Sequence, residues 1–153
     1  MNLAKILIKT SVVRSGMSFG DALQECVDKD VPGIPYVDAE GRIAGRFSVR
    51  HAFRECCVPR DLILGGHLLG DDIDHMNLPE VHAEEVLSAP VENYLLEDAI
   101  RLHCDSHAVR ALALMEQFNT GYLFVTDADD NYRGVITRMG IAKLLTSREC
   151  SDI

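Results

Sequence analysis

Residues 34–48 read Ile34-Pro-Tyr-Val-Asp38-Ala-Glu-Gly41-Arg-Ile-Ala-Gly45-Arg-Phe-Ser48, an apolar run, a polar turn and a second run that ends in a hydroxyl residue. The same layout returns later in the chain as Leu123-Phe-Val-Thr-Asp127-Ala-Asp-Asp-Asn-Tyr-Arg-Gly134-Val-Ile-Thr137. The matching Asp and Gly residues have one offset, since 127 − 38 = 89 and 134 − 45 = 89. An internal repeat at one offset indicates a tandem duplication.

Each copy predicts the same order of elements, a helix, a strand, a turn, a second strand and a second helix. The turns are rich in Asp, Gly and Asn, as is typical of hairpins, and the helices have apolar residues at helical spacing. Ser106 is the predicted N-cap of the second copy's first helix. The expected helices are 18–27, 51–57, 106–118 and 141–147, and the expected strands are 34–37, 43–48, 122–126 and 132–137.

Composition indicates an ordered globular protein without a strong affinity for polyanions. The chain of 153 residues is 47% hydrophobic and 25% charged, and its formal net charge is −9. A net negative field repels nucleic acid and anionic lipid, so we expect neither a nucleic-acid nor a membrane partner. The five cysteines have no disulfide-framework spacing and no signal peptide precedes them, so we expect reduced thiols and a cytoplasmic protein.

The twice-repeated pattern resembles the cystathionine β-synthase (CBS) domain pair. It does so through the Asp, Gly and hydroxyl residues of the two stretches quoted above. The resemblance implies an α/β (α+β) fold of tandem β-α-β-β-α repeats that pack through their sheets as a pseudo-twofold pair, and a homodimer of disk-like modules. We expect repeat 1 at residues 1–57, repeat 2 at 88–153, and no fused catalytic or transport domain.

A long insert separates the two copies. Residues 58–87 exceed a minimal connection, and a loop of that length within a compact module usually has structure of its own. We expect one helix from about Pro79 to Leu87, with Pro79 in its first turn and Pro90 after its end.

The resemblance also implies a ligand cleft between the repeats. In CBS pairs a hydroxyl residue at the end of the second strand, and an Asp three residues later, hold the phosphate and ribose of an adenosyl compound. The hydroxyls here are Ser48 and Thr137, but His51 and Gly140 stand at the Asp positions. The position that contacts adenine in the family is Val135 in the second copy and Arg46 in the first.

Four arginines, Arg46, Arg50, Arg133 and Arg138, lie near the two hydroxyl positions in the sequence. Guanidinium groups suit phosphate, and the N-termini of the following helices would add backbone amides. Alternatively, these arginines are a solvated rim, and the two hydroxyls cap the following helices. Tyr122 either packs in its strand or stacks on a base. The candidate ligand-binding residues are Ser48, Arg50, His51, Tyr122, Val135, Thr137, Arg138 and Gly140.

Catalytic and metal sites find no positive support in the sequence. The acidic stretch from Asp71 to His75 lacks the alternating ligands of a calcium loop. Cys56 and Cys57 have no zinc-site partners at suitable spacing. We expect Cys104 to be a small buried residue rather than a nucleophile paired with His103 or His107. We therefore expect neither an enzyme nor a metal site.

Two functions remain open. The first is a regulatory sensor that binds AMP, ADP, ATP or S-adenosylmethionine between the repeats and modulates a protein partner in trans. The second is a non-catalytic scaffold or interaction module with a degenerate nucleotide site, in which the 58–87 insert supplies the contact surface. No cofactor is required in either case.

Overall fold

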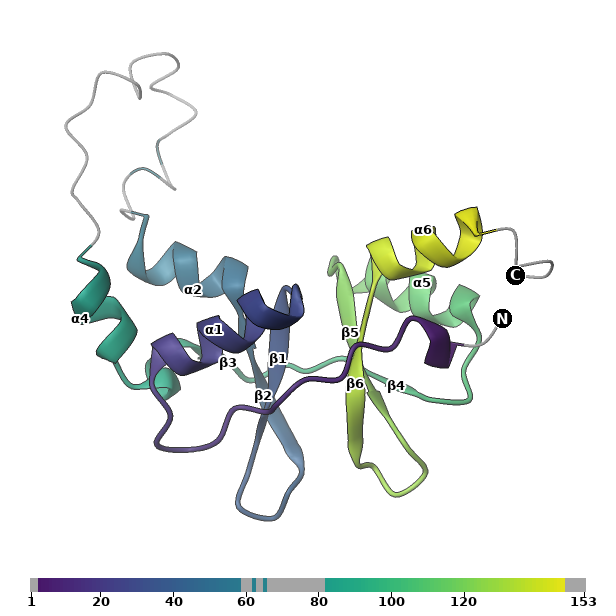
Figure 1. Ribbon diagram of the computed structural model, residues 1–153, viewed down its shortest axis with the longest axis horizontal. Coiled ribbons are helices and arrows are strands. Elements are labelled where there is room, and N and C mark those ends of the chain that lie inside the picture. The colour runs from purple at the N-terminus through teal and green to yellow at the C-terminus, as the bar shows by residue number, and fades with distance from the viewer. Residues whose placement is uncertain (1–2, 59–61, 63–64, 66–81, 148–153) are drawn as a thin grey trace.

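The computed structural model describes residues 3–58, 62, 65 and 82–147. Two similar halves lie side by side (Figure 1), each with a three-stranded sheet and two main helices. The predicted fold class is thereby confirmed. The boundaries 1–57, 58–87 and 88–153 stay a prediction. The acidic stretch Asp71–His75 lies outside the described residues.

The first half has helix α1 (Phe19–Lys29), strands β1 (Gly33–Val37) and β2 (Ile43–Ser48), and helix α2 (Val49–Cys56). Ser18 caps α1 by accepting a hydrogen bond from the backbone N–H of Asp21. The antiparallel β1–β2 hairpin closes on Asp38, whose Oδ1 accepts from the backbone N–H groups of Glu40 and Arg42 at 2.9 and 3.0 Å. The first repeat therefore begins and turns where its polar residues predict.

The second half repeats this order with α5 (Ala108–Gln117), β5 (Tyr122–Thr126), β6 (Tyr132–Thr137) and α6 (Arg138–Thr146). Asp127 closes the β5–β6 hairpin as Asp38 closes the first, accepting from the backbone N–H groups of Asp129 and Asn131, both at 2.9 Å. The predicted N-cap is wrong, because His107, not Ser106, precedes the first turn of α5. The N–H of Ser106 instead bonds to the His103 carbonyl in a turn.

The two halves exchange short segments. Strand β3 (Leu95–Leu96) precedes the second half in the sequence but pairs with β2 of the first sheet. Ile8, which follows the 3-10 helix η1 (Leu3–Lys5), bonds through both its backbone groups to Val135 of β6. Strand β4 (Arg101–His103) pairs in parallel with β5, and Val13 forms the corresponding bridge to Tyr36 of β1.

The sheets pack against each other as well as against their helices. All five residues of β5 are buried. Tyr122 and Phe124 belong to the core of the first half, while Leu123 and Val125 face the core that α5 covers. Alternate side chains of one strand thus point to opposite faces, and both faces are covered.

The described part of the insert includes helix α4 (Ala83–Ser88), which packs against α1. Its C-cap is Ala89, directly before Pro90, as expected; the predicted start at Pro79 lies outside the described residues. The chain continues through the 3-10 helix η3 (Val91–Tyr94) into β3. Among the described helices, none has the length and apolar character that a bilayer crossing requires.

Candidate functional site

A cleft of about 380 Å³ lies where the first repeat meets the second. Its first wall comes from the end of β2 and the exposed side of α2, and its second wall comes from the loop between α5 and β5. Its lining residues are Pro32, Arg46, Ser48, Arg50, His51, Arg54, Leu96, Asn119, Thr120, Gly121 and Tyr122.

Arg46 and Tyr122 form the inter-repeat contact of this first cleft. Arg46 Nη1 donates to the Tyr122 hydroxyl at 2.6 Å, and its guanidinium carbon lies 5.6 Å from the centre of the tyrosine ring. Its Nε and Nη2 bond to the Asp98 carbonyl and carboxylate at 3.0 and 3.2 Å. Burial opposes the charge, but Tyr122 and Asp98 more than offset it and raise the pKa of Arg46. Arg46 is therefore a fixed positive charge on the cleft wall.

The hydroxyls at the two repeat-related positions differ in what they bond. Thr137 Oγ1 accepts the backbone N–H of Gly140 at 2.9 Å and caps α6. Ser48 stands at the corresponding N-cap of α2 but makes no side-chain cap hydrogen bond. Its side chain lines the cleft although the residue is only 5% exposed. The alternative that the hydroxyls cap the following helices therefore holds for Thr137. The Ser48 hydroxyl instead faces the cleft and makes no capping hydrogen bond.

A second cleft, of about 540 Å³, stands at the pseudo-symmetric position. Its Thr137, Met139, Gly140 and Lys143 correspond to Ser48, Arg50, His51 and Arg54 of the first cleft, each at the offset of 89. The other lining residues are Lys5, Ile6, Leu7, Ile8, Lys29, Asp30, Leu144 and Ser147. The duplication thus produces two clefts whose polar groups differ.

Both clefts concentrate positive charge in an acidic chain. Arg46, Arg50 and Arg54 line the first, and Lys5, Lys29 and Lys143 line the second, so six of the 15 Lys and Arg residues lie there. Among the described residues that line either cleft, Asp30 is the only carboxylate, although the whole chain has 24. Clefts focus the field of their lining charges, so each attracts anions despite the net charge of −9.

The predicted ligand-binding residues separate into groups. Ser48, Arg50, His51 and Tyr122 line the first cleft, whereas Thr137 and Gly140 line the second. The remaining two predicted residues, Val135 and Arg138, line neither cleft. Val135 is fully buried in the core and bonds through its backbone to Ile8. Arg138 bonds to the Thr120 carbonyl at 3.2 Å and lies 4.0 Å from Glu116.

The four arginines do not form one cluster. Arg46 and Arg50 line the first cleft, but Arg133 is 60% exposed and pairs with Asp127 of its own hairpin at 3.7 Å. Arg54, which lies one helical turn after Arg50 on α2, also lines this cleft but was not among the predicted residues. This i, i+4 spacing was a usable signal. The lysines of the second cleft gave no signal, because three separate segments bring them together.

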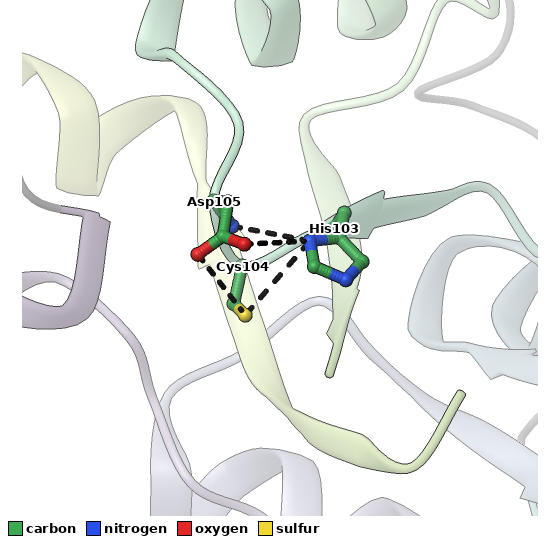
Figure 2. A group of neighbouring side chains, drawn as sticks. All are labelled: His103, Cys104 and Asp105. Atoms are coloured by element: carbon green, nitrogen blue, oxygen red, sulfur yellow. Dashed lines mark hydrogen bonds and ion pairs between the residues drawn. The ribbon is translucent and has the colours of Figure 1, made fainter. Parts of the chain in front are cut away.

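The expectation that Cys104 is buried is wrong, because its side chain is exposed. Its backbone N–H bonds to the Thr126 carbonyl beside β5, and this position directs the side chain outward from the turn after β4. Cys104 Sγ lies 4.0 Å from His103 Nδ1 and 3.9 Å from Asp105 Oδ1 (Figure 2).

Comparison with known proteins identifies the fold. Residues 91–147 match the family model of the CBS domain. The structure resembles a CBS domain-containing protein of unknown function from Bacillus anthracis, with 18% identity, coverage of 97% of this chain and 94% of the other, and a TM-score of 0.66. A CBS domain-containing protein from Kribbella flavida gives 16% identity, 96% and 99% coverage, and a TM-score of 0.68.

A third similar structure is the CBS domain pair of protein MJ0100 in complex with 5′-methylthioadenosine and S-adenosyl-L-methionine. It has 17% identity, coverage of 95% of each chain, and a TM-score of 0.61. The search of the curated proteins found no match. Residues 91–147 therefore match the CBS domain, and the residues that the structure describes have the fold of a CBS domain pair.

Proposed function

We propose that this module is a sensor that binds an anionic adenosyl ligand in the first cleft and thereby regulates a protein partner in trans. The observation that carries this proposal is the coincidence of three arginines with the uncapped Ser48 hydroxyl in one inter-repeat cleft. Of the residues that the structure describes, those that line this cleft include no carboxylate. A phosphate tail would therefore meet complementary charge there.

Each lining residue has a chemically suitable role. Arg50 and Arg54 lie one turn apart on α2 and offer bidentate donors to phosphate oxygens. The Ser48 hydroxyl can donate to the same group, and Tyr122 with Arg46 forms the wall against which the ligand lies. In the second cleft, Thr137 already bonds to Gly140, so its hydroxyl has less capacity for a ligand. Arg138 and Val135 would act only indirectly, through the loop and core that they support.

The proposal fits what is known of one similar structure, since MJ0100 is described in complex with two adenosyl compounds. Charge favours AMP, ADP or ATP over S-adenosylmethionine for this chain, because a sulfonium cation would face the guanidinium groups of Arg50 and Arg54, while Arg46 is paired with Asp98. We propose no catalytic role and no required cofactor.

A second function, the scaffold with a degenerate site, is supported by one specific observation. The positions that hold the ribose-binding Asp in the resemblance are His51 and Gly140. A neutral imidazole offers one acceptor to a diol, and glycine offers no side chain. If these losses abolish binding, the module acts through its surfaces alone.

We also propose that two copies associate through their helices, in the cytoplasm. Large apolar side chains are exposed on α2, α5 and α6, including Phe53, Val109, Met139 and Leu145 at 46–66% of their surface. Figure 1 shows these helices on the side of the molecule away from the hairpin turns. A second copy would cover such apolar surface.

Isothermal titration of the full chain with AMP, ADP, ATP and S-adenosylmethionine tests the sensor. We expect at least micromolar affinity for one or more of the phosphorylated ligands, and weaker binding by about 0.5–1.5 kcal/mol after Ser48→Ala because a hydrogen bond is lost. Arg54→Gln should weaken binding further, since it removes a charge-assisted donor.

Two matched variants serve as controls. Arg133→Gln removes an exposed arginine outside the cleft and should leave affinity unchanged. Thr137→Ala should instead destabilise the folded protein by about 1 kcal/mol, because it removes the α6 cap. A folded protein that binds none of the four ligands would refute the sensor and favour the scaffold.

A further inference from the structure

The turn between β4 and α5 brings together three different metal-ligating side chains. His103, Cys104 and Asp105 are consecutive, and Figure 2 shows the imidazole, the sulfur and the carboxylate directed toward one another. His103 Nδ1 lies 4.0 Å from Cys104 Sγ and 3.6 Å from Asp105 Oδ2, and the sulfur lies 3.9 Å from Asp105 Oδ1. With one donor atom taken from each side chain, the three donors lie within 4.8 Å of one another at the surface.

Backbone hydrogen bonds hold this cluster on the fold. The N–H of Cys104 donates to the Thr126 carbonyl at 2.9 Å, which ties the turn to the end of β5. The N–H of Ser106 donates to the His103 carbonyl, also at 2.9 Å, and closes the turn. The cluster thus lies between a paired strand and a helix, so its three Cα atoms are fixed before any ion binds.

A backbone hydrogen bond also orients the imidazole ring of His103. The backbone N–H of Asp105 donates to His103 Nδ1 at 3.3 Å. This hydrogen bond turns Nδ1 toward Asp105, and a bound ion would replace it on the single lone pair of that nitrogen. A metal ion requires that same unprotonated nitrogen.

The donors lie somewhat farther apart than the ligands on one face of a tetrahedral zinc site. Zinc bonds of about 2.0 Å to nitrogen or oxygen and about 2.3 Å to sulfur place neighbouring ligands roughly 3.3–3.6 Å apart. The pairwise separations are 3.6–4.0 Å when each is measured to the nearer oxygen of Asp105, and all three donors lie within 4.8 Å when one atom is taken from each residue. Small rotations of exposed side chains would close that difference.

We propose that His103, Cys104 and Asp105 bind a borderline divalent cation of the Zn²⁺ class, with the fourth position open to water. A thiolate with an imidazole favours Zn²⁺ or Co²⁺ over Mg²⁺ and Ca²⁺, which prefer oxygen ligands. The thiol loses its proton on binding, and one thiolate with one carboxylate balances the charge of the ion. Because all three residues are exposed, the ion exchanges readily with solvent.

The residues of this site do not recur at the equivalent positions of the first repeat. At the offset of 89, the equivalent residues of the first repeat are Arg14, Ser15 and Gly16, which supply no comparable donors. None of the three cluster residues is among those that line the two clefts. The proposed cation site is thus particular to the second repeat and independent of the proposed adenosyl ligand.

Titration of the full, reduced chain with Co²⁺ alone tests the site, because a cobalt–thiolate bond gives a near-ultraviolet charge-transfer band. We expect this band to saturate at one ion per chain and to disappear when Zn²⁺ is added. Cys104→Ser should abolish the band, and Asp105→Asn should weaken Co²⁺ binding about tenfold or more. The exposed position of Cys104 means that the variant keeps its unfolding midpoint without metal.

The double variant Cys56→Ser, Cys57→Ser is the matched control. It removes two neighbouring thiols outside the cluster and should leave the band intact. Oxygen ligands elsewhere in the acidic chain can bind Co²⁺ but cannot produce a thiolate band. A band that persists in Cys104→Ser, or a wild-type chain that shows none at saturating Co²⁺, would overturn the proposal. Neither outcome bears on adenosyl binding.

Discussion

At the scale of single residues, the duplicated positions Gly33 and Tyr122 show how the two repeats have diverged. Their numbers differ by the repeat offset, 122 − 33 = 89, and they meet at the inter-repeat contact. A β-carbon on Gly33 would lie 2.5 Å from the Tyr122 hydroxyl and 2.7 Å from the Phe47 carbonyl. The glycine therefore makes room for the tyrosine that lines the first cleft.

Gly33→Ala should destabilise the protein by about 1–3 kcal/mol, because the added methyl group overpacks a buried contact. The nearest atoms include a backbone carbonyl of β2, which cannot rotate away. Urea unfolding of the two proteins measures the difference. Gly121→Ala is the matched control, since its added β-carbon would meet no atom within 4 Å and its backbone φ is not positive. Equal stability of both variants would contradict this account of the contact.

At the scale of elements, repeated patterns predicted the two main helices and the two hairpin strands of each half. The strands 43–48, 122–126 and 132–137 were predicted with the bounds observed, because apolar runs between Asp-rich turns leave little freedom. Strand β3 and the pairing of Ile8 were not predicted. They are only one or two residues long, and their partners lie in the other half. Only the tertiary fold determines such pairings.

The candidate site was predictable to a smaller extent. Ser48, Arg50, His51 and Tyr122 were predicted and line one cleft. Val135 and Arg138 were also predicted but do not line this cleft. The backbone of Ile8 pairs with Val135, and Arg138 donates to the Thr120 carbonyl. Whether a hydroxyl caps its helix or faces a cleft depends on its rotamer, which the sequence does not determine.

Helix α1 carries a buried thiol that makes stability depend on pH. Burial, with a smaller contribution from the charge of Glu25, raises the pKa of Cys26 from 9.0 to about 12. A raised pKa means that the folded state holds its proton more tightly than the unfolded state. The contribution of the protonated Cys26 thiol to the free energy of unfolding is therefore fully present below pH 9, and it is lost as the pH rises toward 12.

We expect the free energy of unfolding to fall by about 1.4 kcal/mol per pH unit for this one group within that window. Cys26→Ala should lower stability at pH 8 but should reduce the loss between pH 8 and pH 10.5, as measured by urea unfolding. Cys104→Ala removes an exposed thiol instead and should leave the pH profile unchanged. Tyr132, whose pKa burial also raises to about 12, contributes to the remaining loss in every variant. An unaltered profile in Cys26→Ala would contradict the assignment.

At the scale of the whole molecule, exchanged segments and cross-contacts join the repeats into one cooperative unit. Ile8 completes the second sheet, and β3 completes the first. Arg101 of β4 donates to the Ile43 carbonyl of β2 at 2.6 Å, which adds a hydrogen bond between the halves. Neither sheet can therefore form completely while the other half is unfolded, so both clefts, including the proposed ligand cleft, depend on the integrity of both repeats.

The repeated glycines Gly45 and Gly134 provide a test of this cooperativity. Each lies beneath the segment received from the other half, because an added β-carbon would be 2.5 Å from the Leu96 carbonyl and 2.6 Å from the Ile8 carbonyl, respectively. Gly45→Ala and Gly134→Ala should each cost about 1–3 kcal/mol through displacement of the received segment. Because the halves share segments, we expect each variant to unfold in one transition that both repeats follow. Urea unfolding followed by hydrogen exchange measures this, and a second transition confined to the substituted half would show that the repeats fold independently.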